Sequence, residues 1–323
     1  MIRLLALVCL ALAVPAAADE LRPGYVELRQ RDESRWSLAW KQPLTSAGEP
    51  TLLVPLLPGN CRLADGPHRR LAALALVGNA ELACRGSLAG RRAGYRELLG
   101  GGDALLRVVP LGAPVQSYRL TAAEPSVVLA EAAAPAQVWR TYGWLGVEHI
   151  LAGWDHLLFV IALVLLVRRG WEVAKAVTAF TIAHSLTLAG TTLGLLGLPG
   201  RPVEAVIALS IVFLAVELVR DRGRASLTVR YPWAIACAFG LFHGFGFAGA
   251  LREIGLPEGE VPAALLAFNL GVEAGQLAVV AAVLALLRGM RRSAASALAP
   301  AIRVAGYAIG ITAAYWLIDR LVV

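Results

Sequence analysis

Histidine and carboxylate side chains are concentrated in the apolar half of the chain, where they could hold a metal ion. His149, Asp155 and His156 lie within one short run, and His184 and His243 stand in two later apolar segments. An Asp at the centre of a membrane helix costs about 2.5 to 3.5 kcal/mol, so such residues are kept mainly where they face a cavity, pair or do chemistry. Imidazole and carboxylate groups suit borderline divalent ions such as nickel, cobalt and zinc. The sequence therefore predicts an intramembrane metal site.

The spacing of the first two of these histidines limits how they could bind an ion. His149, Gly153 and His156 share one face of a helix, and Gly153 clears the space between the two rings. On a straight helix the two histidines would be roughly 10 Å apart, too far to bind one ion together. We therefore expect His149 near the outer mouth of a pathway, and Asp155 with His156 at a deeper site. The alternative is that both histidines only hydrogen-bond neighbouring helices.

A polar stripe lies on the fifth apolar segment. Asn269, Glu273 and Gln276 are spaced four and three residues apart, so all three point from one helix face. The stripe either lines a cavity, which we favour, or hydrogen-bonds a neighbouring helix. We expect Glu273 to complete or release the metal site together with His184 and His243, with Asn269 and Gln276 in support.

A pair of small residues flanks one of these histidines in the fourth apolar segment. Gly240 and Gly244 form a small-xxx-small pair, which allows another helix to approach closely. We therefore expect His243 at a tight helix interface.

Six long apolar segments carry these side chains. Each is long enough to cross a hydrocarbon core of roughly 30 Å as a helix. They cover residues 143–167, 174–198, 202–219, 232–251, 261–287 and 301–318. The whole chain of 323 residues is 58% apolar and 16% charged, whereas soluble domains are about a quarter charged. We expect an α-helical polytopic domain over residues 141–323, with the lipid bilayer as its surroundings.

Two signals indicate how the chain is oriented. Residues 1–18 have the layout of a cleavable secretory signal, with Arg3, an apolar run, and Ala16 and Ala18 before the expected cleavage point. Basic residues collect on one side of the six segments, against Arg201, Arg252 and Arg320 on the other. The larger set is Arg168, Arg169, Lys175, Arg220, Arg222, Arg224, Arg230, Arg288, Arg291, Arg292 and Arg303. Because positive residues accumulate on the cytoplasmic side, we expect the exported region and the C-terminus outside a bacterial-type inner membrane.

The formal net charge of +7 is explained by this orientation. The arginines are scattered over three short membrane loops rather than clustered on one surface, so no nucleic-acid partner is expected.

Residues 19–140 have the pattern of a separate extracytoplasmic domain. Short alternating stretches at 25–31, 35–41, 52–57, 71–77 and 104–109 are separated by turn residues. This pattern predicts an all-β, sandwich-like domain whose strands are antiparallel, as a sandwich or a barrel. Cys61 and Cys84 are an exported pair without a C-x-x-C motif, which predicts a structural disulfide. No catalytic cluster stands out in this domain, and a periplasmic partner is one role that it could have.

The first-helix pattern resembles the HupE/UreJ family of nickel or cobalt permeases over about residues 143–320. The residues that carry the resemblance are His149-x-x-x-Gly153-x-Asp155-His156, Phe180-Thr-Ile-Ala-His184-Ser185 and Phe242-His243-Gly244. The chain resembles the branch with a large N-terminal extracytoplasmic domain. The resemblance implies six helices and metal-handling roles for His149, Asp155, His156 and His243. The chain departs from the family where Ile150 stands in place of a usual Pro, and where Phe247 stands in place of a second His.

Three functions are compatible with these observations. The leading hypothesis is an uptake permease for a divalent transition-metal ion, nickel or cobalt first and zinc next, with no organic cofactor; titration of the site groups could couple protons to the ion's movement. A second is an intramembrane metal-dependent hydrolase with Asp155 or Glu273 as its base. A third is an accessory membrane protein whose outer domain binds a partner and whose histidines are structural.

Overall fold

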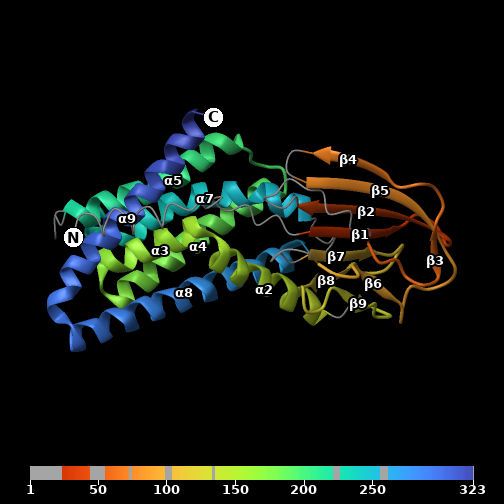
Figure 1. The fold of residues 1–323 in the computed structure, drawn as a ribbon, viewed down its shortest axis with the longest axis horizontal. Helices are drawn as coiled ribbons and strands as arrows, with labels where there is room; N and C mark the ends of the chain where they lie inside the picture. Colours follow the sequence, from red (N-terminus) through yellow and green to blue (C-terminus); the bar gives the residue numbers. More distant parts are fainter. Residues whose placement is uncertain are drawn as a thin grey trace. The chain divides into compact units, whose positions relative to one another are not determined.

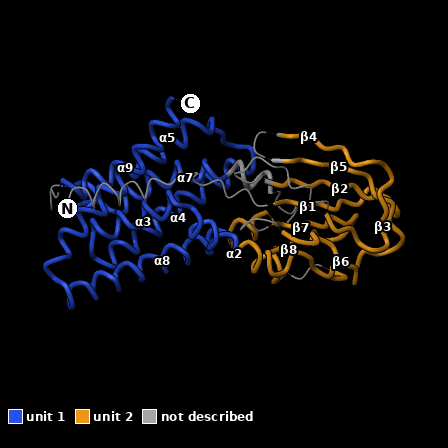
Figure 2. The backbone as a smooth tube through the Cα atoms, viewed as in Figure 1, with its two compact units in different colours: residues 1–20, 143–252, 268–323 blue, residues 21–142, 253–267 orange. Residues whose placement is uncertain are grey.

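The computed structural model describes residues 24–43, 55–72, 75–98, 104–132, 135–220, 226–254 and 261–322. Within these, the chain forms two compact units (Figure 2). The β-rich unit comprises residues 21–142 and 253–267, and the helical unit comprises 143–252 and 268–323. The predicted secretory signal at 1–18 lies outside the described residues, and the predicted boundaries at 18 and 140 stay predictions.

The β-rich unit contains a seven-stranded sheet of order β3-β5-β2-β1-β7-β8, with β4 also paired to β5, and a separate pair β6-β9 (Figure 1). The strands are β1 (Gly24–Gln30), β2 (Arg35–Pro43), β3 (Cys61–Leu63), β4 (His68–Ala72), β5 (Ala75–Cys84), β6 (Arg92–Gly94), β7 (Ala104–Val109), β8 (Gln116–Leu120) and β9 (Ser126–Val128). Alternate residues such as Val26, Leu28 and Leu106 face a buried core, as the sequence pattern predicts.

The expectation of a wholly antiparallel arrangement is wrong. β1 pairs with β2 antiparallel on one edge but with β7 parallel on the other, so the sheet is mixed. A sandwich is not confirmed. The predicted strand 71–77 is split between β4 and β5, which pair antiparallel up to Ala72 opposite Ala75.

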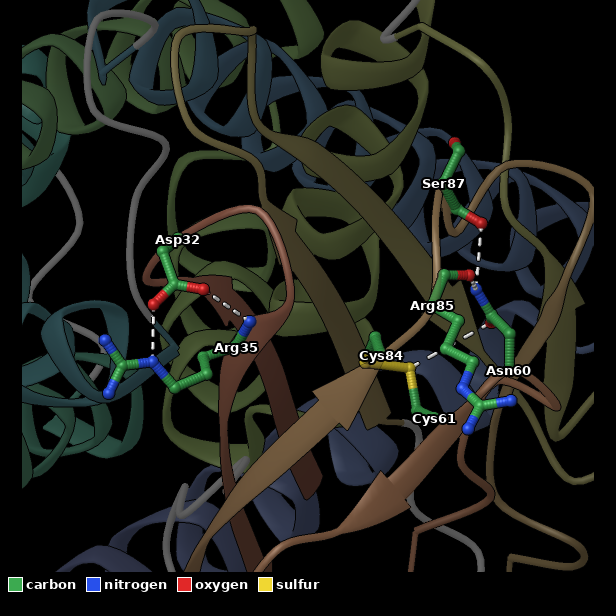
Figure 3. The surroundings of a disulfide bond; sticks show 7 residues. All are labelled: Asp32, Arg35, Asn60, Cys61, Cys84, Arg85 and Ser87. Carbon is green, nitrogen blue, oxygen red and sulfur yellow. Dashed lines mark hydrogen bonds and ion pairs between the residues drawn. A yellow bond between two sulfur atoms is a disulfide. The ribbon is translucent and has the colours of Figure 1, made fainter.

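The predicted disulfide between Cys61 and Cys84 is confirmed. The two cysteines lie directly opposite one another on β3 and β5, as Figure 3 shows. The Asn60 side-chain amide donates to the carbonyl oxygens of Arg85, at 2.7 Å, and Ser87, at 3.0 Å. These bonds and the disulfide hold the segment before β3 against the segment after β5.

Asp32 organises the turn between β1 and β2. Its Oδ1 accepts the backbone N–H groups of Ser34, at 3.0 Å, and Arg35, at 2.8 Å. Its Oδ2 accepts from the Arg35 side chain, and Figure 3 shows the two bonds from Arg35. The bond from Ser34, followed by those from Arg35, lowers the pKa of Asp32 from 3.8 to about 2. The ionised form of this carboxylate is therefore part of the folded turn.

The helices are α2 (Pro135–Ala152), α3 (Trp154–Val167), α4 (Gly170–Thr192), α5 (Gly200–Arg220), α6 (Leu227–Arg230), α7 (Pro232–Ile254), α8 (Val261–Ser293) and α9 (Ala295–Val322). Among the described residues, α4, α5, α8 and α9 are long and apolar enough to cross a membrane, and α2 with α3 makes a fifth span if the bent pair is counted as one. The apolar part of α7, Pro232–Phe247, is shorter. The expected six spans are therefore not confirmed, although each expected segment overlaps a helix or the bent pair.

Apolar side chains cover both the inside and the outside of the helical unit. Leu163 of α3, Val177 of α4 and Ile211 of α5 are fully buried in its core, while large residues such as Leu186 and Ile311 are exposed. An exposed apolar exterior around an apolar core is typical of a helix bundle surrounded by lipid.

Exposed aromatic residues lie beside the basic loops. Trp171 follows Arg169 at the start of α4, and Tyr231 and Trp233 follow Arg230 at the start of α7. Aromatic belts next to arginine-rich loops mark a membrane–water interface. This end of α4 and α7 therefore has the composition expected at the bilayer surface.

Candidate metal centre

A break at Gly153 separates α2 from α3 and brings the first two histidines together. Gly153 has an extended backbone, with φ −75° and ψ 95°, and the two helices are bent by 71°. The ring centroids of His149 and His156 are 4.7 Å apart as a result. The expectation that these histidines are too far apart to share an ion is wrong, because it assumed a straight helix.

Four buried histidines and one aspartate form two groups that could hold a metal ion. One ligand atom each from His149, His156 and His184 lie within 4.8 Å of one another, and the same holds for Asp155, His156 and His243. All five side chains are buried. His156 belongs to both groups, so the structure places the expected outer and deeper sites in one cluster.

Oxygen acceptors fix the orientation of two of these rings. Nδ1 of His156 lies 2.9 Å from Oδ1 of Asp155, and Nδ1 of His184 lies 3.3 Å from Oδ1 of Asn269. Because a carboxylate oxygen and an amide oxygen only accept, both Nδ1 atoms carry the proton. This directs Nε2 of each ring to the cluster. Nε2 of His184 has no hydrogen-bond partner within the part of the chain that the structure describes.

His243 is anchored through Nε2, whereas His156 and His184 are anchored through Nδ1. Ser210 Oγ donates to the carbonyl oxygen of Ile207 at 2.6 Å, so it accepts from Nε2 of His243 at 3.3 Å. Nδ1 of His243 then presents a lone pair toward Nε2 of His156, 3.4 Å away. Two ring lone pairs facing each other repel unless a proton or a metal cation lies between them.

The 3.4 Å separation of these two nitrogens suits a single metal ion. Two imidazole nitrogens bound at 2.0–2.1 Å to a tetrahedral ion lie about 3.3 to 3.4 Å apart. The distance between Nε2 of His156 and Nδ1 of His243 is therefore compatible with both nitrogens binding the same ion.

Aromatic rings enclose the cluster. Phe247 and Phe268 lie 4.1 and 5.5 Å from the ring of His149, and Phe180 lies 5.0 Å from that of His243. Phe247 stands where the resemblance leads one to expect a second His, and this chain places a phenyl ring there. Such a shell excludes water and strengthens interactions with a cation.

The polar stripe of α8 hydrogen-bonds α4, which is the alternative that we did not favour. Glu273 accepts from Thr178 at 2.6 Å, Gln276 accepts from Thr181 at 3.0 Å, and Asn269 bonds the α4 histidine described above. Glu273 belongs to neither metal-binding group formed by the described residues. Of the predicted supporting residues, the structure places only Asn269 against a histidine of the cluster.

Two close helix contacts hold these elements together. A Cβ on Gly244 would lie 2.1 Å from Thr187 Oγ1 and 2.3 Å from the carbonyl oxygen of His184, so α7 packs directly on α4, as the small-residue pair predicts. A Cβ on Gly271 of α8 would lie 1.9 Å from the carbonyl oxygen of Gly143 on α2. Any larger residue at these positions would separate helices that carry the histidines.

Sequence reasoning missed Ser210, Thr178 and Thr181. Ser210 is a single hydroxyl in an otherwise apolar stretch of α5, and serines in that setting commonly bond their own helix. Thr178 and Thr181 precede His184 at intervals of three residues, a helical spacing that matches the α8 stripe. That spacing could have identified the two threonines as partners of the α8 stripe.

A family model described as "HupE / UreJ protein" matches residues 125–320, which is more than half of the chain and includes every residue of the cluster. No curated protein matches the sequence.

Proposed function

The chain belongs to the HupE/UreJ family, and from this premise we propose that it is a membrane transporter for a divalent transition-metal ion. The family is associated with nickel and cobalt transport, and we assign uptake of nickel or cobalt to this member. His149, Asp155, His156, His184 and His243 form the proposed ion site, with Asn269 in support.

The observation that carries this proposal is the anchoring of three histidines by oxygen atoms. Asp155, Asn269 and Ser210 each engage one nitrogen of a ring and leave the other directed at its neighbours. Metal-ligating histidines characteristically make such a bond through the nitrogen that does not bind the ion. Histidines that only cross-link helices have no need to gather in one cluster.

The break between α2 and α3 also supports transport. Transporters commonly bind substrate where a membrane helix is interrupted, because the irregular backbone lines a cavity there. The interruption at Gly153 lies directly between His149 and the pair Asp155 and His156.

We further propose six membrane crossings, with α7 as one of them, a cleaved signal at 1–18, and an extracytoplasmic domain at 19–140. The basic loops and the aromatic residues beside them support a cytoplasmic location for the starts of α4 and α7. In this orientation the chain lies in a bacterial-type inner membrane with its C-terminus outside.

The hydrolase alternative has less support. It needs a carboxylate placed to activate water on the ion, whereas the carboxylate of Asp155 is bonded to His156 and that of Glu273 to Thr178. The accessory-protein alternative depends on a partner of the β-rich unit. A pocket of about 380 Å³ beside Trp36 is a place where such a partner could be sought.

Metal accumulation in cells tests the proposal. Cells that lack this chain are compared with cells that express the wild type, His156→Ala or His68→Ala, and nickel, cobalt and zinc are measured by mass spectrometry. We expect uptake with the wild type and its loss in His156→Ala. His68 is exposed on β4 and remote in sequence from the cluster, so His68→Ala is the matched control and retains uptake.

Unchanged uptake of all three metals in His156→Ala, at equal protein abundance, contradicts the proposal. A hydrolytic product that disappears in His156→Ala would support the enzyme instead.

A further inference from the structure

We propose that a single ion occupies, in turn, two overlapping positions that share Nε2 of His156. The first position is completed by His149 and His184, and the second by His243. This inference rests on the proposed function, because it describes how the transported ion would pass through the cluster.

The first observation is that the histidines do not form a single group. The two metal-binding groups overlap only at His156, and no group formed by the described residues contains His149, His184 and His243 together. One ion therefore cannot reach all four rings at ordinary bond lengths without rearrangement. The arrangement offers two positions rather than one four-histidine site.

The second observation makes the two positions mutually exclusive. Nδ1 of His156 is engaged by Asp155 at 2.9 Å, so an ion reaches this ring through Nε2. One nitrogen lone pair binds one ion at a time. An ion at the first position must therefore leave it before the second position is filled.

The third observation is that transfer needs little movement. Nδ1 of His243 already lies 3.4 Å from Nε2 of His156, a separation that fits two ligands of one tetrahedral ion. As the ion moves, its bonds to His149 and His184 break, a bond to His243 forms, and the bond to His156 persists. The ion is never released, and no electron or proton is required for the exchange of ligands.

The two positions differ in their surroundings. His149 lies against Phe247 and Phe268, whereas His243 is anchored on α5 through Ser210 and lies against Phe159. The ligands that distinguish the two positions come from different helices: His149 from α2 and His184 from α4 for the first, and His243 from α7 for the second.

Titration of the purified full chain with Co²⁺ tests this inference, with bound metal counted by mass spectrometry and its coordination followed by visible absorption. We expect one Co²⁺ per chain at saturation in the wild type. His184→Asn and His243→Asn each still bind one Co²⁺, with different spectra, because each variant keeps one position. The wild-type spectrum is then a sum of the two. His156→Ala weakens binding more than either variant, and His68→Ala changes nothing.

Two results overturn the inference. Two Co²⁺ per chain in the wild type would show a binuclear site, and a loss of binding in His184→Asn or His243→Asn as complete as in His156→Ala would show one combined site. Neither result contradicts metal transport. If the wild type binds Co²⁺ as expected but vesicles containing it accumulate no metal, the proposed function fails and the two-position arrangement stands. If the wild type binds no Co²⁺, both are wrong.

Discussion

Oδ1 of Asp155 lies 2.9 Å from Nδ1 of His156 and also accepts the backbone N–H of His156 at 2.7 Å. One carboxylate oxygen thus fixes both the ring and the backbone of the next residue in the chain. In the proposed site, this oxygen would act on a bound ion through the ring, whose Nε2 it makes more electron-rich.

Replacing Asp155 is expected to weaken metal binding. Loss of the partner of a metal-ligating histidine costs about 10-fold to 100-fold in affinity, and we expect Asp155→Asn at the lower end and Asp155→Ala at the upper end. Chelator competition on the purified chain measures this effect. Asp319→Asn changes an exposed carboxylate of α9 and is the control. Equal affinity in all four proteins would contradict the role assigned to Asp155.

Asn269 is expected to act through His184. Asn269→Leu removes the acceptor of the Nδ1 proton and leaves the ring free to turn, so Co²⁺ affinity should fall by about 10-fold or more. Asn269→Asp retains an oxygen acceptor and should retain binding. Gln276→Leu is the matched control, because Gln276 lies on the same helix face but bonds Thr181. A similar loss of affinity in Gln276→Leu would mean that helix packing, and not the histidine, is affected.

Gly153→Ala is expected to disrupt the convergence of His149 and His156. An added Cβ would lie 2.7 Å from the carbonyl oxygen of His149 and 3.2 Å from Nδ1 of His156, so the break must change shape. We expect metal affinity to fall by more than about 10-fold, as for other losses of ligand support. Gly289→Ala on α8, where a Cβ meets nothing within 4 Å, should bind metal normally. Normal binding by Gly153→Ala would show that the break tolerates a side chain.

Glu273→Gln is expected to leave metal affinity unchanged. A glutamine oxygen can still accept the hydrogen bond from Thr178, which lies 2.6 Å from the carboxylate, and no group of described residues brings Glu273 to the histidines. The measurement is the same Co²⁺ titration. Weaker binding would show that Glu273 contributes to the metal site, as the sequence alone led us to expect.

The turn at Asp32 is expected to lose stability in acid. Its pKa is about 2 in the folded chain against 3.8 ordinarily, so its stabilising effect is present above pH 3.8 and is lost as the pH falls toward 2. Hydrogen exchange at the amides of β1 and β2, compared between the wild type and Asp32→Asn in the full chain, measures this. We expect faster exchange in Asp32→Asn at pH 6 and no difference near pH 2, after correction for intrinsic exchange rates. A difference that persists unchanged into acid would contradict the assignment.

Much of the site could be predicted from residue types, but not its geometry. Asp155 and His156 are adjacent in sequence, so their association follows from local structure. The distance from His149 to His156 could not be predicted, because helical periodicity assumes an unbroken helix. Gly153 is compatible both with a gap between two rings and with a break in the backbone, and only the packed structure distinguishes them.

The fold shows the same division between local and distant information. Alternating residues identified β1 and β7 as strands, with the bounds that the structure confirms within about a residue. Their parallel pairing joins segments far apart in the chain, and periodicity carries no information about a strand's partner. Likewise, the polar stripe of α8 was visible, but its partners Thr178 and Thr181 depend on which helix packs beside it.

Two groups of described residues could bind metal, and Asp155 supplies their one carboxylate. Its charge sets the net charge of the cluster when the proposed transporter holds an ion. Histidines ligate a metal as neutral imidazoles, so a divalent ion beside a single carboxylate leaves the loaded cluster with one net positive charge. Each elementary charge that crosses the full membrane potential is worth about 2.3 kcal/mol per 100 mV. In the proposed uptake, the inside-negative voltage of a cell would therefore favour inward movement of the cation.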